Sequence, residues 1–242
     1  MQPQRLLVAC VALVVLVAGC TGTLVEVRSA PATIAESALS PVGYVHGNTT
    51  EVPLTYPVGV GPVTRDVTVY VWVSGYSRTV ETDVDTDVAV LLVVSSPNHQ
   101  VEGQSVNPFA QLSNRELVDQ LLDLVVEAGA AAGTNVTDVA DLRESGVQER
   151  TVLGQSTEVT TYTATVRYAP VTDVGTATAT DSEGTAPTGG GATEPVFVHL
   201  MAVEHGEDVV FALGVHGESM DEAATMADLM EAIEHDAIVA DD

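Results

Sequence analysis

The chain contains no lysine. Its eight basic residues are all arginine and stand against 34 aspartates and glutamates, so the formal net charge is −26. A nucleic-acid-binding protein carries a basic patch or stripe, and this composition excludes one. Electrostatic attraction to anionic lipid headgroups is excluded for the same reason. The P-loop and the Ser-x-x-Lys motif both require lysine, so those phosphate-binding and acylating sites are excluded too.

Cysteine is also scarce. Cys10 and Cys20 are the two cysteines of the chain, so the 222 residues after Cys20 offer no disulfide, thiolate metal site or cysteine nucleophile. The apolar stretch 6–18 is shorter than the roughly 20 residues that a membrane-spanning helix needs.

The N-terminus has the layout of a lipoprotein export signal. Arg5 precedes the apolar stretch, and small residues lead directly to Cys20. We therefore predict a signal peptide over residues 1–19, lipid attached to Cys20, and a tether over residues 20–29. An uncleaved anchor and a buried core helix are the alternatives. Without a twin-arginine pair, export of the unfolded chain is favoured over export of the folded protein.

The charge imbalance predicts an environment of high salt. In dilute buffer so many like charges oppose the compact state, whereas in molar salt the Debye length falls to about 3 Å and the repulsion fades. The alternative is an acidic disordered chain. A hydrophobic content of 45% and a positive mean hydropathy of +0.23 argue against disorder.

The residues after the tether predict one domain, 30–236, followed by an acidic tail, 237–242. β-branched and aromatic residues at alternating or continuous apolar positions predict strands. We expect strands at 67–80, 88–94, 148–153, 156–169, 196–203 and 209–215. Residues 48–62, which hold three prolines, predict loop or edge structure.

Helical periodicity is clearest at 113–129, where Ser113 and Glu116 form a capping box. A second capping box, Ser219 with Glu222, predicts a final helix whose buried stripe runs from Ala223 to Ile233. Weaker signals predict helices at 30–39 and 137–144. Residues 171–195 are rich in Thr, Gly and Ala without apolar periodicity, and predict a flexible insertion.

The expected fold class is α+β: a mostly antiparallel sheet with helices packed on it, because strands outnumber helices and short turns join consecutive strands.

Several short motifs carry a family resemblance. They are the lipobox at Cys20, residues 30–33 leading to Gly43-Tyr44, Asn107-Pro108, the stretch 112–117, Val152-Leu153-Gly154 and residues 203–206. Together they resemble a haloarchaeal lipoprotein family described only as a domain of unknown function. The resemblance implies a compartment and a host class, and no activity or site residues. The order of elements also resembles the Mog1/PsbP-like sandwich, a fold of binding and assembly proteins.

Metal chemistry has weak support in the sequence. Asp83, Asp85 and Asp87 alternate like the start of a calcium loop, but Val88 and Val94 replace the glycine and glutamate that such a loop needs. A second group, His199, Glu204, His205 and His216, falls on one predicted hairpin, and imidazole with carboxylate is zinc chemistry. No three of these residues share a fixed short spacing. We therefore expect scattered histidines, no metal site and no cofactor.

Two other features are candidate sites. Asn48 and Asn135 begin N-glycosylation sequons. Tyr70, Trp72 and Tyr76 lie on one predicted strand, and they are either core residues or a ligand-binding patch.

These observations lead to a hypothesis of function. No catalytic residue is identified, because a G-x-S-x-G elbow is missing from the sequence. We expect a non-enzymatic, lipid-anchored module on the extracytoplasmic face of a halophile's cell membrane. It would bind an envelope protein or a small solute. The alternative is an extracellular hydrolase with an unrecognised carboxylate or metal site.

Overall fold

The computed structural model describes residues 25–60, 63–81, 86–98, 100–101, 104–105, 107, 109, 112–131, 136–169 and 192–236. Its main feature is a sheet of eight strands in the order β1-β4-β5-β11-β10-β9-β8, with β3 also paired to β4. The strands are β1 Val25–Arg28, β3 Val45–Val60, β4 Val63–Glu81, β5 Thr86–Pro97, β8 Val136–Val152, β9 Gln155–Tyr168, β10 Thr193–His205 and β11 Asp208–Gly217.

The remaining elements are short except for one helix. They are β2 Ala32–Ile34 paired with β12 Ile233–His235, β6 Gln100–Val101 paired with β7 Gln104–Ser105, the helices α2 Glu36–Leu39, α3 Asn114–Ala131 and α4 Ala223–Glu231, and the 3-10 turn η2 Ser40–Val42. Among the described residues, no helix combines the length and the apolar character needed to cross a membrane.

The pairing confirms a mostly antiparallel sheet. Among the strand pairs formed by the described residues of this sheet, only β1 with β4 is parallel. Strands dominate the described residues, so the chain is more β than the expected α+β class implies. Residues 48–60 form an edge strand rather than a loop, which is one of the two alternatives predicted for 48–62. Among the described strands, β3 pairs with β4 alone.

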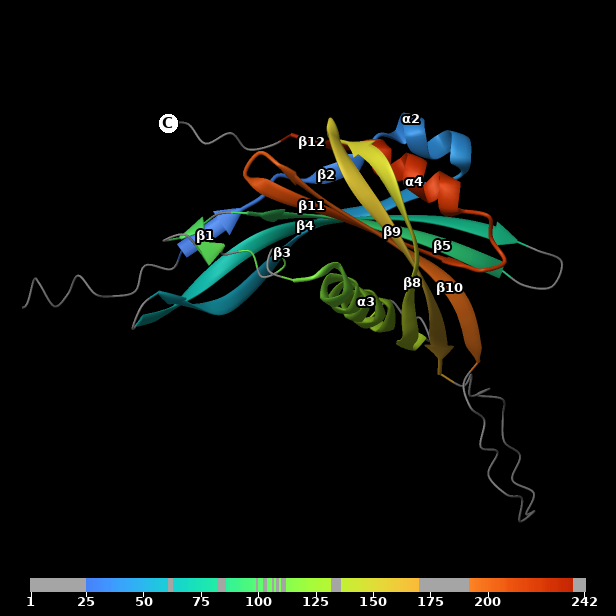
Figure 1. Ribbon diagram of the computed structural model, residues 1–242, viewed down its shortest axis with the longest axis horizontal. Helices are drawn as coiled ribbons and strands as arrows, with labels where there is room; N and C mark the ends of the chain where they lie inside the picture. The colour runs from blue at the N-terminus through green and yellow to red at the C-terminus, as the bar shows by residue number, and fades with distance from the viewer. Residues whose placement is uncertain are drawn as a thin grey trace, which may run out of the picture.

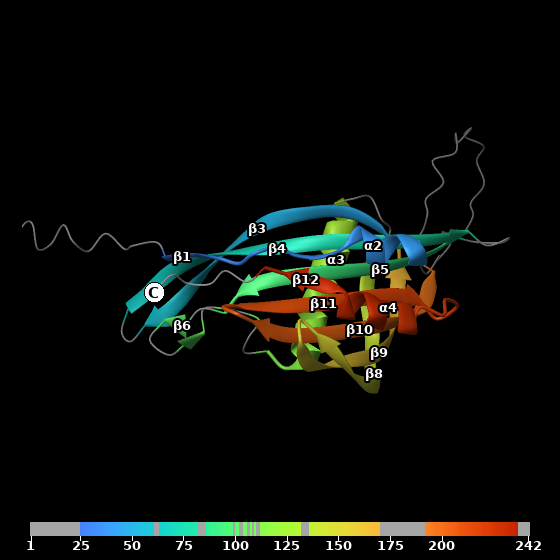
Figure 2. The ribbon, with the colours of Figure 1, turned by 90° about the horizontal axis from the view of Figure 1, so that it is seen from above.

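Hydrophobic side chains gather on both faces of the sheet. In Figure 1, α3 lies below the sheet while α2, α4, β2 and β12 lie above it, and Figure 2 shows this upper layer from above. Leu117, Val118 and Leu121 of α3 belong to a first core with strand residues. Met226 and Met230 of α4 belong to a second. β5 contributes Val94 to the first core and Leu91 and Val93 to the second, so both of its faces are covered there.

The capping box of α3 is confirmed. The Ser113 backbone N–H donates to Glu116 Oε2 at 2.9 Å, and the Glu116 backbone N–H donates to Ser113 Oγ at 3.4 Å. Two backbone donors at the helix start are thereby satisfied by one residue pair. The Ser113 backbone N–H and the Ser113 hydroxyl, which donates to Glu116 Oε2 at 2.8 Å, lower the pKa of the Glu116 carboxyl.

The capping box predicted for α4 is wrong. Ser219 Oγ instead donates to Asp87 Oδ2 at 3.0 Å. The Glu222 carboxylate is 4% exposed and is occupied by Arg78 and by Tyr44 Oη, the latter at 3.1 Å. Partners from distant parts of the chain, which the local sequence does not reveal, therefore fix the start of this helix.

The helix predicted at 137–144 is also wrong, because these residues belong to β8. The strand pairs with β9 through three irregularities, and Asp141 has a positive φ of 56°. Each bulge shifts the alternation of side chains between the two faces. The period-2 pattern that marks a strand is therefore hidden in the sequence of β8.

Three predicted boundaries change. The tether predicted over 20–29 overlaps β1, which begins at Val25. The helix predicted at 30–39 is reduced to α2, preceded by β2. The last three residues of the insertion predicted at 171–195 belong to β10. The signal peptide, the residues 170–191 and the acidic tail lie outside the described residues.

Candidate functional site

The sequon and lipid predictions are only partly within the described residues. Cys20, Asn135, Asp83 and Asp85 lie outside them. Asn48 is exposed on β3 rather than in a loop, beside a β-bulge, and its Nδ2 donates to Thr50 Oγ1 at 2.6 Å. Use of either sequon stays a prediction.

The three aromatic residues of β4 do not form one patch. Tyr76 is 2% exposed, belongs to the second core and accepts a hydrogen bond from the Ile34 backbone N–H at 2.8 Å. Tyr70 and Trp72 are half-buried. The Arg28 guanidinium lies 3.6 Å from the Tyr70 ring centroid, a cation–π contact. For Tyr76 the core interpretation is the correct one.

The strand register brings two histidines together. His199 of β10 faces Gly214 across the β10–β11 pair, and His216 lies two residues further along β11. Side chains two residues apart on a strand share a face, so the two rings are diagonal neighbours. Their Nε2 atoms are 3.0 Å apart, and the ring planes differ by 9°. We call His199 and His216 the pocket pair.

Hydrogen-bond partners orient both rings of the pocket pair. His216 Nδ1 lies 2.9 Å from the Gly217 carbonyl oxygen, and this oxygen only accepts. In the state with two neutral rings, His216 Nδ1 therefore carries the proton, and its Nε2 accepts from His199 Nε2–H. His199 Nδ1 in turn accepts from Thr161 Oγ1, 3.0 Å away. Every ring nitrogen then has one correctly directed partner.

Burial keeps His199 neutral. His199 is 2% and His216 1% exposed. Desolvation, with a smaller contribution from His216, lowers the pKa of His199 to about 4. The protonated form is disfavoured because a buried charge loses its hydration.

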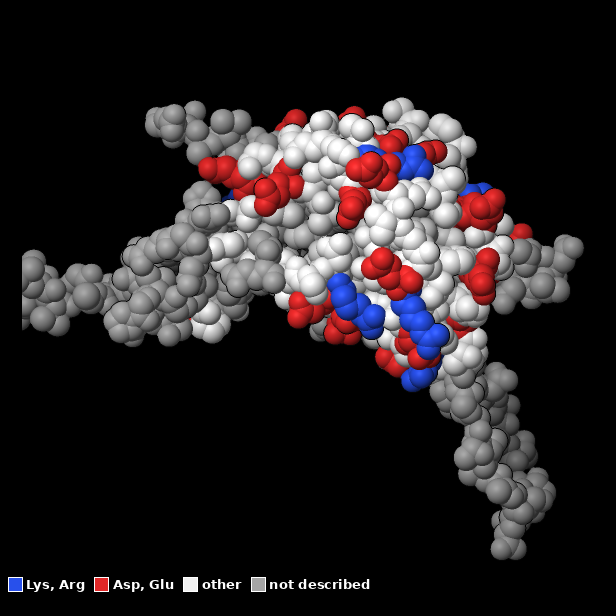
Figure 3. Space-filling view, in the orientation of Figure 1, with Lys and Arg blue, Asp and Glu red and all other residues white. Residues whose placement is uncertain are grey.

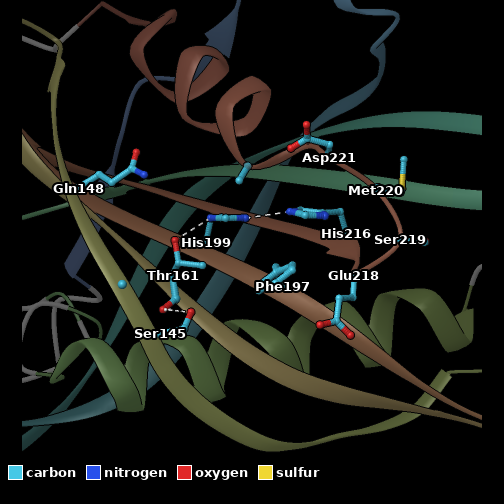
Figure 4. Close-up of a pocket in the computed structure, with 12 residues that line it drawn as sticks. Ser145, Gln148, Thr161, Phe197, His199, His216, Glu218, Ser219, Met220 and Asp221 are labelled. Atoms are coloured by element: carbon cyan, nitrogen blue, oxygen red, sulfur yellow. Dashed lines mark hydrogen bonds between the residues drawn. The ribbon is translucent and has the colours of Figure 1, made fainter.

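A pocket of about 420 Å³ lies over the pocket pair (Figure 4). Thr161, Phe197 and the two histidines come from adjacent strands of the sheet, and Ser145 and Gln148 come from β8. Glu218, Ser219, Met220 and Asp221, in the segment between β11 and α4, also line it, together with Gly146 of β8 and Ala223 of α4. In Figure 4 the two histidines lie between Asp221 on one side and Glu218 on the other.

Gly214 lets α4 approach the sheet next to His199. A Cβ atom at this position would lie 2.8 Å from Met226 Sδ, which is closer than packed atoms allow. The missing side chain therefore makes room for Met226 of α4.

A second pair of histidines lies at the turn end of the same hairpin. His205 Nδ1 and His235 Nδ1 are 3.0 Å apart, and His235 Nε2 is 3.1 Å from Asp208 Oδ2. Asp208 is 2% exposed and also accepts from the Ala30 backbone N–H at 3.0 Å. We call His205 and His235 the turn pair. It links β12 and the N-terminal segment to the β10–β11 turn.

The turn pair does not make a catalytic triad, although a serine is close. Ser95 Oγ lies 3.2 Å from His235 Nε2, the same nitrogen that meets Asp208. A triad needs the serine and the carboxylate on opposite nitrogens of the imidazole. Ser95 is moreover 1% exposed, so a substrate has no access to it.

Metal ligands are sparse. Within the described part of the chain, no group of three or more His, Cys, Asp or Glu side chains is arranged to hold a metal ion. Glu204 does not join the histidines in such a group. It accepts from Asn98 Nδ2 at 3.2 Å.

Sequence reasoning named His199 and His216 but set them aside because their spacing matches no ligand motif. The sequence feature that could have revealed their contact is the turn at Gly206-Glu207. A two-residue turn fixes the register of its hairpin, and the register places His199 opposite Gly214.

Comparison with curated proteins and with solved structures found no match. A family described as a domain of unknown function (DUF6517) matches residues 31–234. This match covers most of the domain, from β2 into β12, and includes His199, His216 and His205. The chain belongs to this DUF6517 family.

Proposed function

We propose that the chain is a non-enzymatic binding module, anchored by lipid to the outer face of a cell membrane, and that it binds its ligand in the pocket over the pocket pair. One observation carries this proposal: two buried, oriented imidazoles lie beneath a pocket of about 420 Å³ on the sheet. Ligand sites in proteins are commonly clefts of this size with a few well-placed polar groups.

The lining of the pocket favours a small polar solute or a polar segment of an envelope protein. Phe197 offers a half-buried apolar surface, and Ser145 and Thr161 offer hydroxyls. Glu218 and Asp221 are exposed acids of the lining. These carboxylates and the net charge of −26 disfavour an anionic ligand and favour one that is cationic or rich in hydrogen-bond donors.

The proposed anchor supports a role in presenting the pocket away from the membrane. Four residues separate Cys20 from the first residue of β1. A fully extended chain of that length spans at most about 17 Å. In Figure 1, β1 lies at one end of the sheet and α4, beside the pocket, lies toward the other. Lipid on Cys20 would therefore hold the β1 end close to the membrane.

The proposal includes a habitat of high salt, that of a haloarchaeal lipoprotein, and the excess of acidic residues supports it. On the face seen in Figure 3 the few arginines lie among aspartates and glutamates. Arg150, for example, lies within 4 Å of both Asp228 and Glu231. The proposal also includes the Mog1/PsbP-like α/β sandwich, a likeness supported by helices on both faces of the sheet in Figure 1.

The binding proposal is tested by capture from envelope. Full-length protein would be incubated with detergent-solubilised envelope in molar KCl, and whatever co-purifies would be compared between variants. Phe197→Ala and Asp221→Asn alter the pocket lining, whereas Val45→Ala alters an exposed residue elsewhere. We expect the two pocket variants to lose the captured molecule and Val45→Ala to retain it. Equal capture by all variants would refute the pocket as the binding site.

The anchoring proposal has a separate test. Cys20→Ser should leave an unprocessed precursor or release the protein from membranes, because the lipid-bearing thiol is gone. Membrane fractionation with immunoblotting measures this. Normal maturation and equal membrane retention of the variant would contradict a lipid on Cys20.

A further inference from the structure

The Nε2 atoms of the pocket pair are spaced like those of two histidines that bind one metal ion. In this structure they share a proton instead. Two imidazole nitrogens bound to one ion at about 2.0–2.1 Å lie about 2.9 Å apart at a right angle and about 3.3 Å apart at the tetrahedral angle. The Nε2 atoms of His199 and His216 are 3.0 Å apart, within this interval.

The outer nitrogens of the pocket pair have the partners that such ligands require. A metal-ligating histidine donates its other ring N–H to a carbonyl, a carboxylate or water, which fixes the tautomer and the ring orientation. His216 Nδ1 already faces the Gly217 carbonyl oxygen. His199 Nδ1 faces Thr161 Oγ1, a hydroxyl that can accept as well as donate.

Metal binding therefore requires little rearrangement around the rings. His199 would exchange its proton from Nε2 to Nδ1, and the Thr161 hydroxyl would turn from donor to acceptor. Both imidazoles stay neutral, so the number of bound protons is unchanged. The ion would lie off the line that joins the two Nε2 atoms, because two bonds of about 2.0–2.1 Å do not fit along their 3.0 Å separation, and the two rings would tilt toward it.

We propose that the pocket pair binds a divalent transition-metal ion of the Cu²⁺ and Zn²⁺ class through His199 Nε2 and His216 Nε2. Imidazole suits these ions, whereas Mg²⁺ and Ca²⁺ prefer oxygen ligands. Among the described residues, no third His, Cys, Asp or Glu side chain joins the pair as a metal ligand. The remaining coordination positions therefore face the pocket, where water or a donor atom of the solute completes them. This inference rests on the proposed function of the pocket and names the chemistry of its ligand.

Titration of the full-length protein with Cu²⁺ tests the proposal. Any free cysteine thiol would first be alkylated, and excess Mg²⁺ with molar KCl would occupy the many surface carboxylates. Electron paramagnetic resonance reports how many nitrogens bind the ion. We expect one equivalent of Cu²⁺ with hyperfine splitting from two nitrogens.

Variants then locate the site. His199→Gln and His216→Gln should each lower Cu²⁺ affinity by at least about 100-fold, because loss of a second-shell partner alone typically costs 10–100-fold. Thr161→Val removes such a partner and should cost about 10-fold. His205→Gln removes a histidine of the turn pair and should leave the spectrum unchanged. A two-nitrogen spectrum that persists in His216→Gln, or its failure to appear in the wild type, would overturn the proposal.

A measurement on the wild type covers the case in which the variants do not fold. Long-range ¹H–¹⁵N spectra of the histidine rings should show that Zn²⁺ shifts the Nε2 resonances of two rings and leaves the other four in place. Unshifted rings would equally overturn the metal site. If no metal binds but Phe197→Ala still loses the captured envelope molecule, the metal inference fails and the binding module stands. If the metal binds but Phe197→Ala captures the envelope molecule as the wild type does, the metal inference stands and the proposed binding site fails.

Discussion

The pocket pair and the turn pair are both made of two histidines with at least one on the β10–β11 hairpin, yet they differ in what surrounds them. The pocket pair, His199 and His216, has a hydroxyl and a carbonyl at its outer nitrogens. In the turn pair, His235 meets the buried carboxylate of Asp208. Neutral partners let the first pair move a proton within a ring and bind a ligand, as proposed above. The carboxylate of the second fastens Ala30 and His235 to the start of β11.

Removing the Asp208 carboxylate should disrupt the turn pair and cause the largest loss of stability. Asp208→Ala leaves both the His235 ring and the Ala30 backbone N–H without their acceptor in a buried site. A buried donor left without its acceptor costs about 1–3 kcal/mol, so removing the acceptor of two donors should cost about 2–6 kcal/mol. Denaturant unfolding in molar KCl measures the loss. Asp236→Ala, at an exposed carboxylate on the same segment, should change stability little. Equal losses in the two variants would show that Asp208 is not a structural anchor.

Acid should weaken the pocket pair. The pKa of His199 is lowered to about 4 in the folded protein, against about 6.5 in an unfolded chain. The unfolded state therefore binds more protons between these values, and the stabilisation is present above pH 6.5 and is lost as pH falls toward 4. The whole shift corresponds to about 3 kcal/mol.

Carboxylates titrate in the same pH range and also change the stability. The effect of His199 is therefore measured as the difference in stability between two variants. Unfolding of the wild type and of His199→Gln would be compared at a series of pH values with a chelator present. The gap in stability between them should shrink as pH falls from 6.5 to 4. A gap independent of pH would mean that His199 has an ordinary pKa.

Filling the space beside His199 should have an intermediate effect. Gly214→Ala places a methyl group 2.8 Å from Met226 Sδ and forces the Met226 side chain to move. Overpacking of this kind costs about 1–3 kcal/mol. Gly146→Ala, at a pocket glycine with nothing within 4 Å of the added atom, should be nearly neutral. Thermal unfolding separates the two, and equal melting temperatures would show that α4 is not closely packed on the sheet here.

The smallest effect concerns one hydroxyl. Thr161→Val removes the donor to His199 Nδ1 while keeping the side-chain shape. The loss should be about 1 kcal/mol, the usual net contribution of a hydrogen bond. Thr161→Ser keeps the hydroxyl and should retain most of the stability in denaturant unfolding. If Val and Ser behave alike, the hydrogen bond contributes nothing measurable.

Local sequence was informative where both partners of an interaction are close in the chain. Ser113 and Glu116 are three residues apart, and their capping box formed as predicted. Leu153 and Gly154, both with positive φ, form the two-residue turn of a hairpin that was expected one residue further on. Ser219 and Glu222 have the same spacing as the first box, but distant partners took both side chains.

The sequence by itself determined the charge, the lack of lysine, the strand-rich pattern and the course of the β10–β11 hairpin. These follow from composition and from neighbours in the chain, which act in any fold. Only the tertiary structure decided that Tyr76 is core, that β8 is a bulged strand, and that His199 and His216 lie nitrogen to nitrogen under a pocket. Their burial, and with it the lowered pKa of His199, depends on α4 and on β8 and β9, whose positions are set by packing between residues far apart in the chain.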